Sequence, residues 1–328
     1  MLILGNEQVR SLLSDADDEV LAAVRAAYVE HERGRTALPH SVFLRFPEEQ
    51  RNRIIALPAY LGGDDPVTGV KWISSFPGNV AAGQPRASGV IVLNSVHTGV
   101  PEALLNAAVI SARRTAASAA LAAATIRSVV PDTGIALVGC GVINGEVLRF
   151  VTRAMPLVDT VTLFDTDLAR AEAFAADCAH RHPGLKVEVA ADIATALGAH
   201  RLVSLATTAV TPHLDGGQLR PGTLVLHLSL RDLTAATVLA SANIVDDVDH
   251  VCRASTSVHL AAEQAGHTRF VSASLGALLL ADEPYRRDER GLTLFSPFGL
   301  GILDLAVSNL VRRRALARGV GTELADFT

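Results

Sequence analysis

This sequence has few cysteines, few lysines, few aromatic residues and no long uninterrupted apolar run. Its three cysteines, Cys140, Cys178 and Cys252, lie far apart and form no C-x-x-C pair, which excludes a disulfide framework and a cysteine-ligated zinc site and fits a reducing compartment. Polar and charged residues interrupt each apolar stretch before it reaches about 18 residues, so we expect no membrane span. The N-terminal segment lacks a basic region and a cleavage site, which predicts a cytoplasmic protein.

The composition that is present describes a globular protein. The 328 residues are 49% hydrophobic and 19% charged, which is enough for one large or two ordinary domains. Lys and Arg number 29 against 34 Asp and Glu, giving a net charge of -5. This balance argues against a phosphate backbone as ligand, so we expect no nucleic-acid partner. Histidines such as His250 and His259 lack the spacing of a metal pair, and we expect no metal.

The chain up to residue 130 mixes helix and strand signals. Asp15 and Asp17 can cap a helix whose apolar positions run from Val20 to Tyr28 and which stops at Gly34. Four β-rich runs suggest an antiparallel sheet, and they are residues 41–46, 53–57, 67–76 and 88–93. An alanine-rich stretch over residues 106–128 predicts a helix.

From Gly134 onward, short apolar runs alternate with helical segments. The six runs are residues 135–138, 161–164, 187–189, 202–206, 224–228 and 244–245. This alternation is typical of a parallel sheet with crossover helices, so we predict an α/β protein with a Rossmann-type doubly wound sheet. A last helix begins at residue 300. The expected domains are residues 1–130 with the C-terminal helix 300–328, an α+β unit with antiparallel strands, and residues 131–299.

A dinucleotide site is expected at the start of the second domain. The segment Ile135-Ala-Leu-Val-Gly139-Cys-Gly141-Val-Ile-Asn144 has the strand, glycine turn and helix order that a pyrophosphate requires, although Asn144 occupies the third glycine position. Asp165 ends the next strand, where a carboxylate would hold the ribose hydroxyls and repel a 2′-phosphate, which favours NAD over NADP. The alternative is an ordinary strand-to-helix turn with Asp165 in a loop.

Two cationic features of the first domain are candidates for chemistry. Lys71 is one of only two lysines and lies beside the only tryptophan, Trp72. A compact ammonium can pair with a carboxylate or shuttle a proton, but a surface lysine beside a core tryptophan is also consistent with the pattern. Arg113 and Arg114 lie in the alanine-rich helix, where consecutive side chains point about 100° apart. Only one of them is expected to face the sheet, and either could lie on a solvated helix face.

Two further candidates follow strands of the second domain. Asp232 comes after the fifth strand and could take a proton from an amine or a water during hydride transfer. It could equally cap a helix over residues 233–240. Thr207 lies at the end of the fourth strand, at the edge where ligands of such sheets bind, or it caps a helix.

Several segments resemble the ornithine cyclodeaminase and mu-crystallin family over essentially the whole chain. The matching pieces are Arg35-Thr-Ala-Leu-Pro-His-Ser41, Leu57-Pro-Ala-Tyr60, Lys71 with Phe76-Pro-Gly-Asn79, Arg114-Thr-Ala-Ala117, the Gly139-x-Gly141 turn, Ser229-Leu-Arg-Asp232 and Phe295 to Asp304. Segments 43–47, 52–61 and 71–79 look like the branch of this family that makes 2,3-diaminopropionate.

The resemblance implies an NAD-dependent oxidoreductase of amino acid metabolism. The reaction it implies is oxidative hydrolysis of N-((2S)-2-amino-2-carboxyethyl)-L-glutamate to L-2,3-diaminopropionate and 2-oxoglutarate, in siderophore or other specialised-metabolite biosynthesis. Alternatives are a cyclodeaminase-type lyase, a ketimine reductase or alanine dehydrogenase, and a nucleotide-binding protein without turnover. The first domain would bind substrate and form a homodimer, and residues 131–299 would bind NAD.

The resemblance also assigns roles to individual residues. Lys71 and Asp232 would be catalytic. Substrate would contact Arg35, Lys71, Arg86, Arg114 and Phe298. The cofactor would contact Arg114, Gly139, Gly141, Val142, Ile143, Asn144, Asp165, Thr207, Leu228 and Gly299.

Three positions depart from the cyclodeaminase pattern. Ile55 stands where cyclodeaminases carry an acid, which argues against deamination of a basic diamine. Arg86 replaces a threonine and adds a cation that a substrate with extra carboxylates could use. Pro297 replaces a serine near the cofactor.

Overall fold

The computed structural model describes residues 1–326, which form two compact units. The first unit contains residues 1–114 and the chain from residue 299 onward, and the second contains residues 115–298. One division therefore falls inside helix α3 (Ala107–Thr125) and not after residue 130, where the sequence analysis placed it. A continuous alanine-rich helix carries no sequence signal at the point where it passes from one unit to the other.

The first unit is built on an eight-stranded, mainly antiparallel sheet, as the sequence predicts. The strand order is β16-β1-β7-β6-β5-β4-β2, with β3 also paired to β4, and only β1 and β7 run parallel. The strands are β1 (Leu2–Leu4), β2 (Thr36–Ala37), β3 (Val42–Phe46), β4 (Glu49–Leu61), β5 (Val67–Ser75), β6 (Ala87–Asn94), β7 (Pro101–Asn106) and β16 (Thr322–Glu323). The four predicted strands are present, but β1, β2, β7 and β16 were missed because they are short or begin at a proline.

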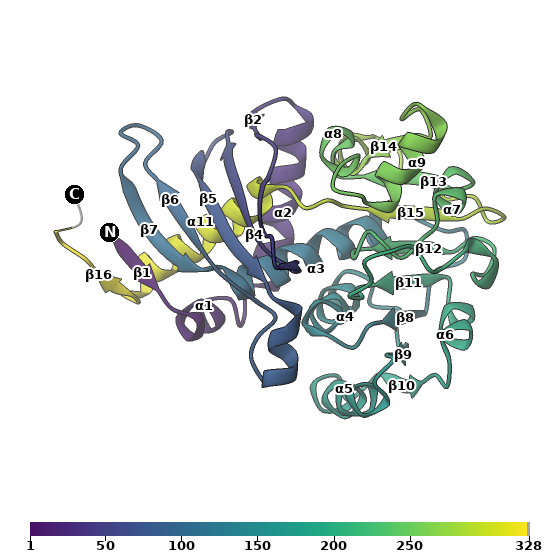
Figure 1. The fold of residues 1–328 in the computed structure, drawn as a ribbon. Coiled ribbons are helices and arrows are strands. Elements are labelled where there is room, and N and C mark those ends of the chain that lie inside the picture. Colours follow the sequence, from purple (N-terminus) through teal and green to yellow (C-terminus); the bar gives the residue numbers. More distant parts are fainter. Residues whose placement is uncertain (327–328) are drawn as a thin grey trace. The chain divides into compact units, whose positions relative to one another are not determined.

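Helices cover one face of this sheet. Helix α11 packs on β4, β5 and β6 and also against α2 (Figure 1). The helices of this unit are α1 (Asn6–Leu12), α2 (Asp17–Glu32), the 3-10 helix η1 (Pro77–Ala82), α11 (Gly301–Arg318) and the part of α3 up to residue 114. The predicted aspartate cap of α2 is wrong, because Ala16 occupies the N-cap position and the Asp15 carboxylate instead binds Arg314 of α11 at 2.6 Å.

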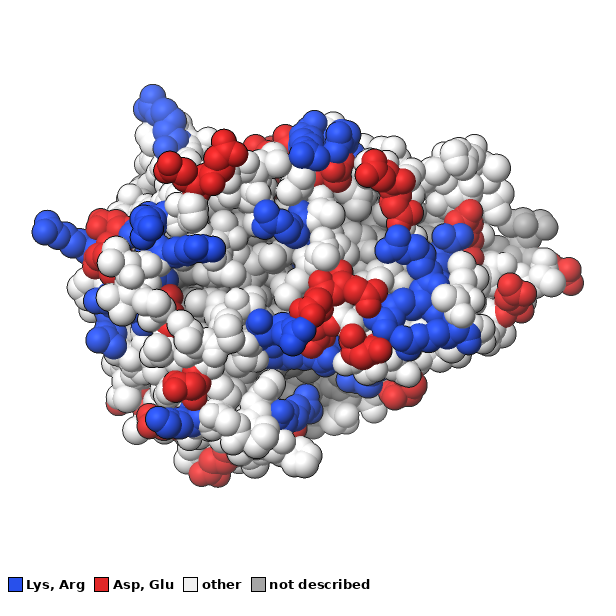
Figure 2. All heavy atoms as spheres, turned by 180° about the vertical axis from the view of Figure 1, so that it is seen from behind, with Lys and Arg blue, Asp and Glu red and all other residues white. Residues whose placement is uncertain are grey.

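The arginines at the end of α11 are paired with acids of the same unit. Arg312 contacts Glu102 at 2.8 Å, and Arg313 contacts Asp65 at 2.6 Å. On the face drawn in Figure 2, Lys and Arg side chains lie interspersed with Asp and Glu side chains. The charges of these arginines are therefore balanced by neighbouring acids, as the sequence of a structural helix end would require.

The second unit is built on an eight-stranded parallel sheet in the order β10-β9-β8-β11-β12-β15-β13-β14, so the doubly wound fold is confirmed (Figure 1). Its strands are β8 (Gly134–Val138), β9 (Thr160–Phe164), β10 (Lys186–Val189), β11 (Leu202–Leu205), β12 (Leu224–His227), β13 (Ala242–Val245), β14 (Val271–Ser274) and β15 (Thr293–Ser296). The six predicted strands are present, and β14 and β15 are additional. The strand order reverses between β8 and β11, which is where ligands of such sheets bind.

The helices of the second unit connect these strands. They are α4 (Val142–Ala154), α5 (Leu168–Arg181), α6 (Ile193–Ala199), η2 (Gly216–Gln218), α7 (Ala235–Leu239), α8 (Val248–Val251), α9 (Ser257–Ala265) and α10 (Leu275–Leu280). Aspartate side chains cap several of them, as Asp167 does for α5 and Asp192 for α6. Within residues 1–326, no helix combines the length and the apolar character that crossing a membrane would require.

Candidate active site

The glycine turn after β8 has the backbone that a dinucleotide cradle requires. Gly139 has a φ of +94°, and a Cβ atom placed on it would lie 2.5 Å from the carbonyl oxygen of Ala206. A Cβ atom on Gly141 would meet nothing within 4 Å, so open space lies above the turn. Helix α4 begins directly after Gly141, and its first N–H groups are available to an anion. These features fit a dinucleotide pyrophosphate.

The turn predicts a large effect of one added methyl group. Gly139→Ala should weaken NAD binding by about tenfold or more, because alanine is strained at this φ and its methyl group collides with Ala206. Isothermal titration calorimetry with NAD measures the effect. Gly198→Ala in α6 is the matched control, since its new methyl group meets no atom within 4 Å and should leave the affinity unchanged. Equal affinities of the two variants would contradict the role of the turn.

Asp165 lies beside the turn, as the sequence predicts. One carboxylate oxygen accepts the N–H of Cys140 at 2.8 Å, and the other accepts the N–H of Asp167 at 3.0 Å. Each oxygen keeps a further lone pair for a hydroxyl donor. Asp165 can therefore hold ribose hydroxyls while it is fixed to the turn.

Asn144, a predicted cofactor residue, uses its side-chain amide for contacts beneath the turn. The side chain is fully buried and donates to the carbonyl oxygens of Val138 at 3.0 Å and Gly139 at 2.8 Å. Its amide oxygen accepts a hydrogen bond from Ser204 at 2.7 Å. The side-chain amide is thus occupied by three protein contacts beneath the turn.

The remaining predicted cofactor residues of this unit follow neighbouring strand ends. Val142 and Ile143 open α4, Thr207 follows β11, and Leu228 follows β12. Because β8, β11 and β12 are adjacent and parallel, these residues share the carboxyl edge of the sheet with the glycine turn. Val142 is exposed and Leu228 is half-buried.

Asp232 is a fully buried carboxylate that collects several hydrogen-bond donors. The hydroxyl of Thr207 donates to one oxygen and that of Ser229 to the other. His227 Nε2 lies 3.4 Å from a carboxylate oxygen and accepts the Asp232 N–H at 3.3 Å. Burial alone would raise the pKa of Asp232, but its contacts with His227, Ser229 and Thr207 outweigh burial and lower it. The carboxylate is therefore ionised at neutral pH.

The structure excludes the capping alternatives for Asp232 and Thr207, and their functional roles stay predictions. The N-cap of α7 is Thr234, so Asp232 does not cap that helix. Thr207 donates to Asp232 and accepts the N–H of Ala209 at 3.1 Å, and within residues 1–326 no helix begins directly after it. Leu230, between Ser229 and Asp232, has a φ of +65°, a conformation that non-glycine residues rarely adopt. This strained segment turns Asp232 back toward β11.

Lys71 belongs to a buried charge cluster in the first unit. It is 2% exposed while Trp72 is 43% exposed, so the lysine and not the tryptophan lies inside. Its Nζ atom lies 2.7 Å from Asp304 of α11 and 3.3 Å from the hydroxyl of Ser111. Arg114 Nε lies 3.1 Å from the other oxygen of Asp304. Burial lowers the pKa of Lys71 to about 8, opposed by Asp304 and reinforced by Arg114.

This cluster has two cations and one anion. Asp304 is fully buried, and Arg114 is 9% exposed. Gly299 lies against the Arg114 guanidinium, since a Cβ atom on it would be 2.7 Å from a terminal nitrogen. An excess positive charge in a desolvated position favours a bound anion, because unpaired buried charge is costly. The cluster can therefore hold a ligand carboxylate.

Arg113 and Arg114 are both buried, so neither lies on a solvated helix face. Arg113 donates to the carbonyl oxygen of Leu13, which holds the segment before α2, while Arg114 faces Asp304. Arg113 is structural, and Arg114 belongs to the charge cluster.

The structure does not place the other predicted substrate residues in the charge cluster. Arg35 is exposed and forms a two-pronged ion pair with Glu30, which raises the pKa of Arg35. Arg86 is half-buried, and its Nε atom has no hydrogen-bond partner within residues 1–326. Burial lowers the pKa of Arg86.

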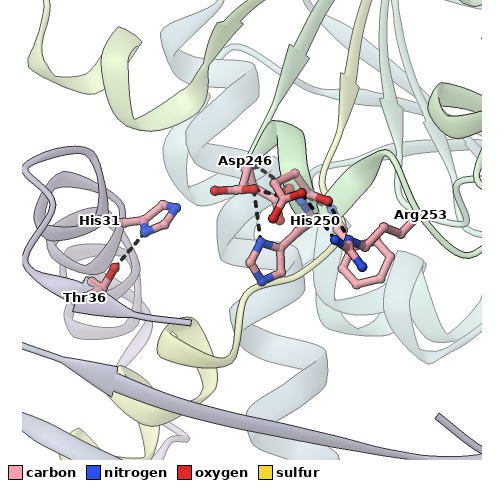
Figure 3. A network of polar contacts seen from close by, with 8 residues as sticks. His31, Thr36, Asp246, His250 and Arg253 are labelled. Carbon is pink, nitrogen blue, oxygen red and sulfur yellow. Dashed lines mark hydrogen bonds and ion pairs between the residues drawn. The ribbon is translucent and has the colours of Figure 1, made fainter. Parts of the chain in front are cut away.

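Phe298 is held by a polar network in the second unit. Its N–H donates to the buried carboxylate of Asp246 at 2.9 Å, and its ring centroid lies 6.4 Å from that of His250. His250 Nδ1 lies 3.0 Å from Asp247, and this contact raises the pKa of His250. Figure 3 shows His250 beside Asp246 in this network. Asp246 thus fixes the chain just after β15.

Sequence reasoning missed three residues that complete these groups. Asp304 binds both Lys71 and Arg114, and His227 and Ser229 bind Asp232. The local motif Ser229-Leu-Arg-Asp232 held a signal for Ser229, since a hydroxyl three residues before a carboxylate can reach it. Asp304 carried no such local signal. Separately, within residues 1–326 no group of three or more His, Cys, Asp or Glu residues could hold a metal ion.

Known proteins are similar to this chain over nearly its full length. The N-((2S)-2-amino-2-carboxyethyl)-L-glutamate dehydrogenase of Staphylococcus aureus is 26% identical over 330 residues, covering 99% of this chain and 98% of the relative. The Δ1-pyrroline-2-carboxylate reductase of Thermococcus litoralis, solved with NADH and L-proline, has a TM-score of 0.90 at 26% identity and covers 99% of this chain and 100% of that chain. An archaeal alanine dehydrogenase dimer with bound NAD has a TM-score of 0.87 at 26% identity, covering 100% and 99%.

These relatives agree with the sequence analysis on fold, cofactor and reaction class. The fold class is confirmed, and the expected NAD cofactor and oxidoreductase activity are those of the relatives. The model of the ornithine cyclodeaminase/mu-crystallin family matches residues 2–319. The chain belongs to the ornithine cyclodeaminase/mu-crystallin family.

Proposed function

We propose that this protein is an NAD-dependent dehydrogenase that oxidatively hydrolyses N-((2S)-2-amino-2-carboxyethyl)-L-glutamate to 2-oxoglutarate and L-2,3-diaminopropionate. The observation that carries the proposal is the buried cluster of Lys71 and Arg114 around the single carboxylate of Asp304. Its excess positive charge suits a substrate carboxylate, and the curated relative from Staphylococcus aureus carries this activity in its name.

The proposed reaction needs residues that bind NAD and residues that bind the substrate and accept its proton. The glycine turn, Asp165, Thr207 and Leu228 would hold NAD, which supplies the hydride acceptor. Lys71 and Arg114 bind a substrate carboxylate. Asp232 accepts the proton of the secondary amine as the Cα–N bond is oxidised to an imine. Addition of water to that imine and collapse of the adduct then separate the two products.

Arg86 favours this substrate over a simpler one. The proposed substrate has three carboxylates, whereas alanine and proline have one each. A desolvated guanidinium that lacks a partner on Nε is suited to a second carboxylate. Arg35 can contribute only by sharing its Glu30 partner. Charge-assisted contacts of this kind contribute about 1.5 to 3 kcal/mol each.

An alanine dehydrogenase or pyrroline-carboxylate reductase activity is the second candidate. The charge cluster alone satisfies one substrate carboxylate, and solved relatives with these activities share the fold. Such a substrate has no second carboxylate for Arg86 to bind. A cyclodeaminase-type lyase differs in producing no net reduced cofactor.

The decisive experiment incubates the protein with the amine adduct and NAD, follows absorbance of the reduced cofactor, and identifies both products by mass spectrometry. Alanine, proline and ornithine are assayed in parallel. We expect turnover of the adduct, and an Arg86→Thr variant should raise its KM about tenfold or more while kcat changes little. Proline formation from ornithine without any oxidation of the adduct would overturn the proposal.

The lowered pKa of Lys71 predicts a pH dependence of substrate binding. Because only the protonated amine attracts a carboxylate, KM for the amino acid substrate should rise as pH increases through about 8. Lys71→Arg keeps its charge in this range and should lose the rise, which separates it from titration of the substrate itself. Initial rates between pH 6.5 and 9.5 measure this, and identical profiles of the two proteins would remove Lys71 from the binding role.

We propose that the first unit also forms a homodimer. Four exposed apolar side chains, Val42, Leu44, Tyr60 and Trp72, lie on the sheet face opposite that of Lys71, as the strand register requires. An apolar sheet face of this kind is typical of a protein interface. Light scattering should give twice the 34.4 kDa chain mass, and Trp72→Arg should give the single-chain mass. A single-chain mass for the unaltered protein would reject the dimer.

A further inference from the structure

Asn144 and Ser204 form a fully buried hydrogen-bonded pair beneath the glycine turn. Asn144 lies in the first turn of α4, and Ser204 lies in the adjacent strand β11. The pair stands where the dinucleotide pattern has its third glycine, a residue with no side chain to place. The second unit therefore carries a polar group at a position that usually serves only close packing.

The amide of Asn144 is nearly fully satisfied. Its two N–H bonds reach the carbonyl oxygens of Val138 and Gly139, at 3.0 and 2.8 Å, and its oxygen accepts the Ser204 hydroxyl at 2.7 Å. Removal of the serine hydroxyl would leave a buried amide oxygen without that donor, which costs free energy and loosens the amide. Ser204 therefore fixes the orientation of Asn144.

Asn144 in turn fixes one peptide plane of the turn. In a trans peptide the carbonyl and the N–H point in opposite directions. The carbonyl of Gly139 points inward to Asn144, so the N–H of Cys140, in the same plane, points the other way and donates to Asp165 at 2.8 Å. The plane is held at both ends, and rotation of the plane would move the donor that orients Asp165.

We propose that Ser204 and Asn144 are positioning residues that set the place of Asp165, and through it both the affinity for NAD and the preference for NAD over NADP. The chain of contacts runs from Ser204 through Asn144 and the peptide between Gly139 and Cys140 to the Asp165 carboxylate. The side chains of Ser204 and Asn144 are fully buried and act through the turn. The inference concerns dinucleotide binding and does not depend on which amino acid the protein oxidises.

A double-mutant cycle tests the coupling. Ser204→Ala, Asn144→Gly and the double variant are titrated with NAD and with NADP by calorimetry, without amino acid substrate. Ser204→Ala should weaken NAD binding about five- to tenfold, the effect of one lost buried hydrogen bond. Asn144→Gly removes three hydrogen bonds and should weaken NAD binding at least as much, and both variants should reduce the preference over NADP. In the Asn144→Gly background the further change Ser204→Ala should alter the affinity by less than about twofold, because its partner is already absent.

A matched control separates positioning from stability. Thr223→Val removes another buried hydroxyl of the same unit, which donates to the Arg220 carbonyl oxygen at 2.7 Å. Its melting temperature should fall while both dinucleotide affinities stay unchanged. If Asn144→Gly does not fold, the ratio of the NAD affinity to the NADP affinity in Ser204→Ala tests the inference without it. The inference would be overturned if Ser204→Ala and Asn144→Gly lowered the melting temperature but left both dinucleotide affinities unchanged. It would also be overturned if their effects on NAD affinity were additive in the double variant.

Discussion

Replacing Asp232 by asparagine is expected to lower kcat by a factor of about 10² to 10⁴, the range over which a positioned acid or base contributes. The amide has nearly the same shape but cannot accept a proton from the substrate amine. It also presents an NH2 group to Thr207 or Ser229, both of which donate to the carboxylate. The variant should therefore lose the proton acceptor, and its NH2 group should repel one hydroxyl hydrogen. The glycine turn should remain intact.

The measurements must separate chemistry from binding. Steady-state rates give kcat and KM, and calorimetry gives the NAD affinity, which should change little. Ser229→Ala is the control, because it removes one donor but keeps the carboxylate. It should raise the pKa of Asp232, so the acid side of its kcat profile should shift to higher pH. An Asp232→Asn variant with more than a tenth of the original kcat would exclude a proton-transfer role.

The sequence predicts the second unit better than the first because its signals are local. Strand, glycine turn and acid follow one another along the chain, and the parallel sheet brings successive strand ends to one edge. Thr207 and Asp232 were both recognised as strand-end residues. Their direct contact follows from the adjacency of β11 and β12, which the order of strands in the chain does not specify.

The first unit depends on register and on contacts across the whole chain. Alternation along β5 shows that Lys71 and Trp72 face opposite sides, but not which side is buried. Helix α11 decides this, because it packs on the sheet face that carries Lys71. Asp304 is 233 residues from Lys71 in the chain, so no local pattern joins the two. The rarity of lysine in the composition nevertheless singled out Lys71, which is one of two lysines in the chain.

Replacing Asp304 by asparagine is expected to reduce the free energy of unfolding by about 3 to 5 kcal/mol. Asp304 is the shared acid partner of Lys71 and Arg114, and all three side chains are buried. Without the carboxylate, two buried cations repel each other and lack compensation. Urea unfolding at pH 7, followed by circular dichroism, measures the loss.

Lys71→Met is the informative comparison for Asp304→Asn. It removes one cation and leaves Arg114 paired with Asp304, so the cluster becomes neutral. The Lys71→Met protein should therefore unfold at nearly the original urea concentration. Its KM for the substrate should nevertheless rise, because the excess positive charge that attracts a carboxylate is gone. Stability and substrate affinity should thus separate: Asp304 mainly supports the fold, and Lys71 mainly binds. Equal losses of unfolding free energy in the two variants would mean that the cluster is an ordinary structural ion pair, without an excess positive charge that could bind a ligand carboxylate.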